Sequence, residues 1–294
     1  MKRNTDVLII GGGPAGIVCA LTARWNYPEK KILLMRDVEQ GVIPCGIPYM
    51  ISSLEKPEQN AASYSSLEKQ GVDLVVERAV RIDRKTKTVH TESGNDYHYE
   101  KLVLALGSTP ILPPVSGIEK KGVYPIKKDL GYLTKMVEDI KKCRKILVLG
   151  GGFIGVEFAD ELSRIKGLEV VVVEMLPHLL ANSFDPEFSK LVEEKLRSQG
   201  VRILTNTRVE EILGDEKVQK ARLSNGDEMD IDRVILGIGA KPNTKLATDA
   251  GLELGRGKGI WVDEYMSTTD PDIFAIGDCA GKREFFTRKD APIL

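Results

Sequence analysis

The stretch at residues 145–155 reads KILVLGGGFIG, an apolar run that ends in a glycine-rich turn. A helical pattern and a second apolar run follow it, so the order is strand, GxGxxG, helix and strand. This order is the dinucleotide-binding fingerprint. Gly150 permits the tight turn, Gly152 lets a pyrophosphate approach the backbone, and Gly155 lets the helix pack on the strand. The stretch therefore predicts an α/β unit with a parallel sheet that binds a dinucleotide.

The residue that closes the second strand of this unit indicates which nucleotide it binds. Glu174 directly follows the run EVVVV at residues 169–173. A carboxylate at this place accepts hydrogen bonds from both ribose hydroxyls and repels a 2′-phosphate. The unit is therefore predicted to bind NADH, with NADPH as the alternative.

The same plan begins near the N-terminus, where residues 6–16 read DVLIIGGGPAG. Its fingerprint glycines are Gly11, Gly13 and Gly16. An acidic residue should close the second strand here as well, but Met35 and Arg36 stand at that place and Asp37 comes late. We therefore expect Arg36 or Asp37 to hold the ribose of the first nucleotide.

The two halves of the chain repeat one plan of fingerprint, β-hairpin layer and apolar strand entering a glycine loop. The clearest pair is KLVLALGSTP at residues 101–110 and RVILGIGAKP at residues 233–242. Such a repeat predicts two nucleotides bound by one chain. A last apolar run, IFAIGD, ends at Asp278, whose carboxylate would accept from a ribityl hydroxyl or lie in an ordinary solvent-facing turn.

Length and composition set the broad class. The chain has 294 residues, which suits about two domains. Lys+Arg 42 against Asp+Glu 43 leaves a net charge of −1, so no overall field attracts nucleic acid or an anionic membrane. No apolar run approaches the roughly 18 residues of a membrane span. The cysteines lie far apart without CxxC pairs, which predicts no metal site and a cytoplasmic protein.

The stretch GVIPCGIPY at residues 41–49 surrounds Cys45. Pro44 and Gly46 predict a turn there. Residues 47–54 predict a short helix, which would put the sulfur at a helix N-terminus and favour the thiolate. A cysteine is also often buried as a small hydrophobe, so both a reactive and a structural Cys45 stay open on these residues alone.

Two further stretches carry expectations about local structure. Asp185 and Pro186 predict the start of a helix that ends at Gln199. Its apolar residues are predicted to form a single buried face: Phe188, Leu191, Val192 and Leu196. The proline-rich residues 113–125 are predicted to be a linker.

Five motifs in order carry a resemblance to a known family: GGGPAG at 11–16, ALGSTP at 105–110, GGGFIGVE at 150–157, GIGAKPN at 237–243 and FAIGD at 274–278. The chain resembles the pyridine nucleotide–disulfide oxidoreductase flavoproteins over essentially its whole length. The resemblance implies an α/β fold of two Rossmann-like, three-layer ββα domains, with the NAD domain inserted in the FAD domain. It implies an FAD domain at 1–115 and 244–294 and an NAD(P) domain at 116–243.

The resemblance also implies the cofactors and the residues that hold them. FAD is implied to lie on Gly11, Gly13, Pro14, Ala15, Gly16, Arg36, Asp37, Val80, Gly107 and Asp278. NADH or NADPH is implied to lie on Gly150, Gly152, Ile154, Gly155, Glu174 and Gly239. Phe153 falls where an aromatic gate covers the flavin, and Glu157 falls where a carboxylate lies near the flavin and the nicotinamide.

Within the family, Cys45 resembles the single-cysteine branch of coenzyme A-disulfide reductases, persulfide or polysulfide reductases, and NADH oxidases and peroxidases. The two-cysteine types need a second nearby cysteine, but Gln40 stands where one would be and Cys143 is alone. The resemblance implies an FAD-dependent NAD(P)H oxidoreductase with one redox-active cysteine. Its acceptor would be a small-molecule disulfide, persulfide or polysulfide, or oxygen.

Two other functions stay open. One is an electron-transfer reductase of the ferredoxin or rubredoxin type, in which Cys45 is idle. The other is an inactive nucleotide-binding fragment, since the family's C-terminal dimerisation domain is expected to be missing from this chain although full-length relatives are expected to be homodimers. Structural or surface roles are expected for the remaining cysteines and the histidines: Cys19, Cys143, Cys279, His90, His98 and His178.

Overall fold

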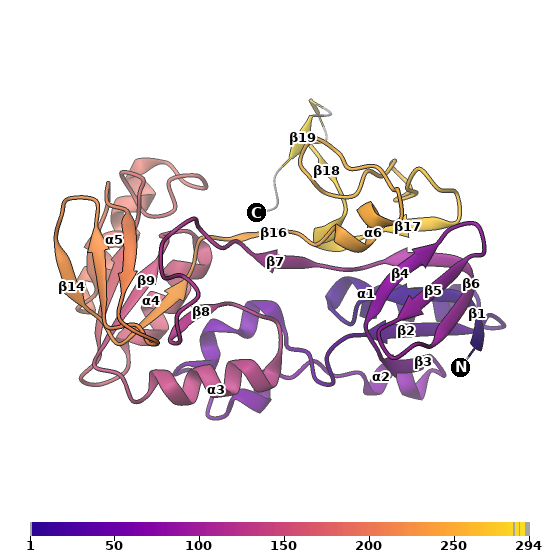
Figure 1. The fold of residues 1–294 in the computed structure, drawn as a ribbon, viewed down its shortest axis with the longest axis horizontal. Coiled ribbons are helices and arrows are strands. Elements are labelled where there is room, and N and C mark those ends of the chain that lie inside the picture. The colour runs from indigo at the N-terminus through magenta and orange to yellow at the C-terminus, as the bar shows by residue number, and fades with distance from the viewer. Residues whose placement is uncertain (1, 285, 288, 292–294) are drawn as a thin grey trace. The chain divides into compact units, whose positions relative to one another are not determined.

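The computed structural model describes residues 2–284, 286–287 and 289–291 (Figure 1). The chain divides into two compact units, each built from separate stretches of sequence. Unit 1 comprises Met1–Ile43, Ala62–Thr109 and Ala240–Leu294, and unit 2 comprises Pro44–Ala61 and Pro110–Gly239. Among the described residues, no helix has the length and apolar character needed to cross a bilayer.

Unit 1 is built on a sheet with strand order β3-β2-β1-β6-β5-β4, in which β17 also pairs with β6. Strands β3, β2, β1, β6 and β17 run parallel, whereas β5 and β4 form an antiparallel extension. The bounds are β1 (Lys2–Ile10), β2 (Ile32–Arg36), β3 (Asp73–Val76), β4 (Ala79–Asp83), β5 (Thr88–Thr91), β6 (Asp96–Leu104), β17 (Ile273–Ala275), α1 (Pro14–Asn26) and α2 (Ser65–Lys69).

The parallel part of this sheet is buried on both faces. Leu8 and Ile10 of β1 enter one apolar cluster, whereas Ile9 enters another on the opposite face. Successive side chains of a strand point to opposite faces, so a run such as LII can be apolar throughout only when both faces are covered. Strand β6 runs without a break from Asp96 to Leu104.

Unit 2 repeats the plan with a parallel sheet of order β11-β10-β9-β15-β8. An antiparallel sheet of order β12-β13-β14 packs with it. The bounds are β8 (Val123–Pro125), α3 (Leu130–Ile140), β9 (Lys145–Leu149), α4 (Phe153–Ser163), β10 (Glu169–Val173), α5 (Pro186–Ser198), β11 (Arg202–Leu204), β12 (Val209–Leu213), β13 (Lys220–Leu223), β14 (Glu228–Asp230) and β15 (Arg233–Leu236). The predicted α/β fold with an internal repeat is confirmed.

The other elements are short. They are η1 (Pro44–Gly46), η2 (Pro48–Met50), η3 (Pro57–Asn60), β7 (Ser108–Pro110), β16 (Ala240–Pro242), α6 (Lys245–Asp249), η4 (Gly277–Cys279), β18 (Lys282–Arg283) and β19 (Asp290–Ala291). The prediction that residues 113–125 form a linker is wrong for the last three residues. These residues form β8, which pairs with β15 in the parallel sheet.

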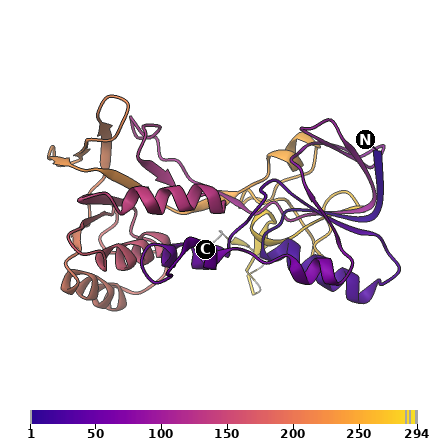
Figure 2. The ribbon, with the colours of Figure 1, turned by 90° about the horizontal axis from the view of Figure 1, so that it is seen from below.

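The cysteine segment, residues 44–61, differs from the expectation in two ways. The predicted helix at 47–54 is absent, and the 3₁₀ turns η1 and η2 take its place, with Cys45 inside η1. The closely spaced Pro44 and Pro48 break up a longer helix. The segment also groups with unit 2 rather than with unit 1, because η2 packs on α4 and η3 packs on α3. Figure 2 shows this dark purple segment beside α3, as Figure 1 does.

The predicted buried face of α5 is wrong. Phe188 and Leu191 are 59% and 61% exposed, although Leu196 is buried as expected. The helix instead turns Ser189 and Glu193 inward. The Glu193 carboxylate accepts from the backbone N–H of Leu179 at 3.1 Å, and tertiary hydrogen bonds of this kind outweigh the apolar periodicity.

Candidate functional site

The glycine loop after β1 has two glycines that the fold itself requires. Gly11 has φ +125°, and a Cβ there would lie 2.0 Å from the carbonyl oxygen of Ala105. A Cβ at Gly16 would lie 1.9 Å from the carbonyl oxygen of Gly11. A Cβ at Gly13, by contrast, would meet nothing within 4 Å, so its free space faces outward at the N-terminus of α1. This is the arrangement that lets a pyrophosphate approach backbone N–H groups.

The second strand of unit 1 ends beside the glycine loop, because a Cβ at Gly12 would lie 2.9 Å from Arg36 Cβ. Met35 is 0% exposed and faces the core. The Arg36 guanidinium donates to the carbonyls of Val38 and Glu39 and lies over the ring of Tyr64. Tyr64 was not singled out from the sequence, where an isolated tyrosine carries no signal.

Two other predicted flavin residues belong to unit 1, one directly after β2 and one on β4. Asp37 follows Arg36 and is exposed. The backbone N–H of Glu77 donates to the Arg36 carbonyl at 2.8 Å. The short turn between β3 and β4, which precedes Val80, therefore begins beside the end of β2. Val80 is exposed on β4.

Asp278 lies in η4, which packs against the first turn of α1. Ser108, which directly follows Gly107, donates from its Oγ to Asp278 Oδ2 at 2.8 Å. A Cβ at Gly277 would lie 2.8 Å from the Cβ of Ala15, so η4 closely approaches α1. The structure thus brings residues from three separate motifs of the sequence to one place in unit 1.

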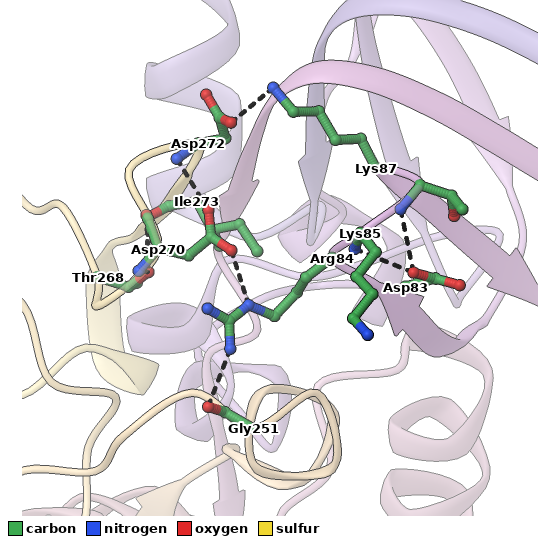
Figure 3. Close-up of polar contacts among 10 residues, drawn as sticks. Asp83, Arg84, Lys85, Lys87, Gly251, Thr268, Asp270, Asp272 and Ile273 are labelled. Atoms are coloured by element: carbon green, nitrogen blue, oxygen red, sulfur yellow. Dashed lines mark hydrogen bonds and ion pairs between the residues drawn. The ribbon is translucent and has the colours of Figure 1, made fainter.

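A network of ion pairs anchors the strand that leads to Asp278 (Figure 3). Arg84 Nε lies 2.7 Å from Asp270 Oδ2, and Lys87 Nζ lies 2.5 Å from Asp272 Oδ2. Figure 3 shows the two basic side chains reaching from the β4–β5 hairpin to the loop before β17. The hairpin layer therefore positions the loop from which β17 and Asp278 follow.

The glycine loop after β9 repeats these constraints in unit 2. Gly150 has φ +105°, and a Cβ at Gly155 would lie 1.9 Å from the Gly150 carbonyl oxygen. A Cβ at Gly152 would meet only the Gly237 carbonyl oxygen, at 3.9 Å. Gly152 is the N-cap of α4, so its open side offers helix N-terminal N–H groups to an anion.

Glu174 is buried and already bonded to the loop. Its Oε2 accepts from the Gly151 backbone N–H at 2.6 Å, and its Oε1 accepts from the Leu176 backbone N–H at 2.7 Å. A carboxylate has about four acceptor sites, so two of its lone pairs remain for ribose hydroxyls. The side chain therefore orders the glycine loop as well as facing the predicted nucleotide site.

Helix α4 carries the predicted residues around the nicotinamide. Phe153 is its first residue and is 47% exposed, and Ile154 beside it is half-buried. Glu157 lies one turn further on the same face, and burial raises the pKa of its carboxyl above the ordinary value. Gly239, with φ +93°, ends the loop after β15, and a Cβ there would meet nothing within 4 Å.

Cys45 is exposed, unlike the other cysteines. Burial raises the pKa of the Cys19 and Cys143 thiols to about 11. It also raises the pKa of the Cys279 thiol, which is fully buried. A thiol with a raised pKa is a poor nucleophile near neutral pH, so Cys45 is the accessible candidate.

The histidines make local pairs outside the glycine loops. His90 Nδ1 lies 2.7 Å from Asp96, His98 Nδ1 lies 2.9 Å from Thr88 Oγ1, and His178 Nδ1 lies 3.2 Å from Glu193. The described residues contain no cluster of three or more side chains suited to a metal ion.

The chain is similar to proteins of known families along its whole length. The family model described as pyridine nucleotide-disulphide oxidoreductase matches residues 5–290. An NADH oxidase of Methanocaldococcus jannaschii is 33% identical over 95% of this chain and 64% of the relative. An NAD(P)H coenzyme A polysulfide/persulfide reductase of Pyrococcus horikoshii is 31% identical over 98% of this chain and 65% of the relative. The chain thus spans slightly less than two thirds of these curated relatives.

A solved structure shares the fold. The NAD-dependent persulfide reductase from A. fulgidus superimposes with a TM-score of 0.91 at 34% identity, over 100% of this chain and 56% of that one. The family uses FAD and NAD(P)H, so the predicted cofactors are confirmed at the level of the family. The match over residues 5–290, together with the two glycine loops, leads to one conclusion: the chain belongs to the pyridine nucleotide-disulphide oxidoreductase family.

Proposed function

We propose that this protein is an FAD-dependent NAD(P)H oxidoreductase in which Cys45 reduces a disulfide, persulfide or polysulfide. The observation that carries the proposal is the exposed Cys45 in a segment that packs on α4, the helix with Phe153 and Glu157. The relatives named as persulfide reductases support it. A soluble small-molecule sulfur acceptor fits an exposed thiol better than a buried one.

The residues of both loops fit the two cofactors. The open sides of Gly13 and Gly152 leave room for pyrophosphates, and the overlaps at Gly11, Gly16 and Gly155 leave no room for a side chain. FAD would be held by the loop of unit 1 with Ser108 and Asp278, and NADH by the loop of unit 2 with Glu174. FAD, when bound, would supply the two-electron chemistry that links oxidation of NADH to reduction of sulfur.

Cys45 supplies the nucleophile. Its thiolate attacks one sulfur of R–S–S–R, a Cys45–S–S–R bond forms, and RS⁻ leaves and takes a proton. Two electrons from NADH then cleave the Cys45–S–S–R bond, which releases a second RSH and restores the thiolate. The balance is NADH, one proton and RSSR giving NAD⁺ and two RSH.

A second candidate is an NADH oxidase, which the relative from Methanocaldococcus jannaschii favours. In that case oxygen replaces the sulfur compound as acceptor. Aerobic NADH consumption without added disulfide would then exceed anaerobic consumption with it.

The test is an anaerobic titration with NADH of FAD-loaded protein that has first been oxidised with a small disulfide and freed of the excess, followed by the visible spectrum. Wild type should consume about one more NADH per flavin before bleaching than Cys45→Ser, because an oxidised Cys45 takes two electrons. Cys143→Ser is the matched control, since its half-buried thiol should leave consumption unchanged. Equal consumption by wild type and Cys45→Ser would contradict the proposal, and a protein that stays colourless with FAD would favour the inactive fragment.

A further inference from the structure

Glu161 of α4 is a buried carboxylate that the proposed chemistry does not use. It is 1% exposed. Its Oε2 accepts from Ser52 Oγ at 2.6 Å and from the Ser53 backbone N–H at 2.9 Å, and its Oε1 accepts from Ser53 Oγ at 2.7 Å. Burying a carboxylate is costly unless its oxygens are hydrogen-bonded or paired. All three of these donors come from the cysteine segment.

Arg164 completes the contact from the exposed side. Its Nη1 lies 3.2 Å from Glu161 Oε1 and donates to Ser53 Oγ at 2.8 Å. The Ser53 hydroxyl therefore accepts from the guanidinium and donates to the carboxylate at the same time. This closed arrangement defines the positions of all three side chains, because each hydrogen bond restrains the next.

The cysteine segment is itself tightly packed, so a contact at its middle restrains its beginning. A Cβ at Gly46 would lie 1.9 Å from Asn60 Oδ1, and Asn60 Nδ2 lies 3.4 Å from the sulfur of Met50. Asn60 and Met50 are both buried. Gly46 and Asn60, near the two ends of the segment, are thus in close contact. Cys45 directly precedes Gly46, so this contact also restrains its backbone.

Helix α4 presents Phe153, Glu157 and Glu161 at intervals of four residues. Residues spaced in this way lie on one face of a helix, one turn above another. The attachment point of the cysteine segment therefore shares a rigid element with the two predicted residues of the nicotinamide site.

We propose that Glu161 is a positioning residue that fixes Cys45 relative to Phe153 and Glu157 through Ser52 and Ser53. The proposal rests on the proposed function, because positioning matters only if electrons pass to Cys45. A displacement of about 1 Å in such an arrangement can cost about 10²-fold in rate. Neither the family resemblance nor the motif spacing assigns this role to Glu161.

The test uses Glu161→Gln in the FAD-loaded protein, because the amide replaces one acceptor oxygen by a donor that faces another donor. Hydrogen exchange of the amides in residues 44–61 should become faster. The rate of electron transfer to an aromatic disulfide probe such as dithiobis(nitrobenzoate), through Cys45, should fall between about 10-fold and 10²-fold. Flavin bleaching by NADH alone should change by less than about twofold, since Glu161 does not contact either glycine loop.

Glu211→Gln is the matched control. Glu211 lies on β12 of the same unit and pairs with Arg222 at 2.6 Å, without a described contact to the cysteine segment. Both readouts should stay at wild-type values. If Glu161→Gln does not fold, Ser53→Ala removes one donor and should move both readouts in the same direction.

The inference is overturned if Glu161→Gln and Ser53→Ala both leave the hydrogen exchange of residues 44–61 unchanged. It is also overturned if both leave the rate of electron transfer through Cys45 unchanged. Failure of the proposed function has a different signature. Cys45→Ser would then match wild type with the disulfide probe, while exchange in Glu161→Gln still became faster. In that case Glu161 holds the segment without serving Cys45, and the positioning role is rejected.

Discussion

Single carboxylates in this protein order the backbone at the predicted sites. Glu174 is the clearest case, because one of its oxygens accepts the backbone N–H of Gly151 in the glycine loop and the other accepts the backbone N–H of Leu176. The charge of Glu174 is therefore expected to have two effects. It strengthens the hydrogen bond from the Gly151 N–H, and it repels a phosphate attached to the ribose of a bound nucleotide. These two roles can be separated by an isosteric neutral side chain.

Glu174→Gln should raise the ratio of kcat/KM for NADPH over NADH by about tenfold, equivalent to about 1.4 kcal/mol. The neutral amide no longer repels a 2′-phosphate, and its carbonyl oxygen can still accept one backbone N–H. Steady-state kinetics with both nucleotides measure the ratio.

Glu169→Gln is the control for this change. Glu169 begins the same strand, is exposed and pairs with Lys145 at 2.9 Å. Its neutralisation should leave the nucleotide preference unchanged. A preference that is insensitive to Glu174→Gln would mean that another group selects the nucleotide.

At the scale of elements, the strand–loop–helix units contain glycines that the packing requires and glycines that only the predicted binding would require. Gly16 lies against the Gly11 carbonyl and lets α1 approach β1. Gly13 has φ −80° and open space, so an alanine there fits the backbone. Both positions belong to one motif in the sequence, yet the packing around them differs.

Gly13→Ala should leave the thermal stability of the FAD-free protein within about 0.5 kcal/mol of wild type and weaken FAD binding by at least about tenfold. The added methyl occupies the side from which a pyrophosphate approaches. Gly16→Ala should lower the stability of the FAD-free protein, because its Cβ overlaps a backbone oxygen. Thermal unfolding and FAD titration followed by fluorescence measure the two effects. Equal destabilisation by both variants would contradict this division.

At the scale of the whole molecule, each unit has its own buried core and its own glycine loop. Unit 1 packs its core on β1 and β6, and unit 2 packs its core on β9 and β15. Each nucleotide should therefore stabilise the unit that holds it, because a ligand that binds only the folded form shifts that equilibrium.

FAD should slow hydrogen exchange at residues 11–16, 105–108 and 277–279 of unit 1. NAD⁺ should slow exchange at residues 150–155 and 174–176 of unit 2. Mass spectrometry of peptides after exchange, with each nucleotide added separately, measures both patterns. Protection of residues 11–16 by NAD⁺ in the FAD-free protein would show that the assignment of the two loops is reversed or shared.

Much of this protein follows from sequence alone for a local reason. A tight turn that only glycine tolerates, followed by a helix that must pack on the preceding strand, is encoded within about fifteen residues. The two α/β units, their order and the turn around Cys45 could therefore be predicted, whereas the exposure of Cys45 could not. The apolar runs of β1 and β9 also predict strands buried on both faces, because the pattern lies within each strand.

Tertiary structure decided the features that depend on distant partners. The cysteine segment joins unit 2 because Ser52 and Ser53 meet Glu161, residues separated by more than a hundred positions. The inward face of α5 is set by Glu193, whose partner Leu179 lies outside the helix. No periodicity within a segment contains this information, because the hydrogen-bond donors of buried carboxylates such as Glu161 and Glu193 lie elsewhere in the chain.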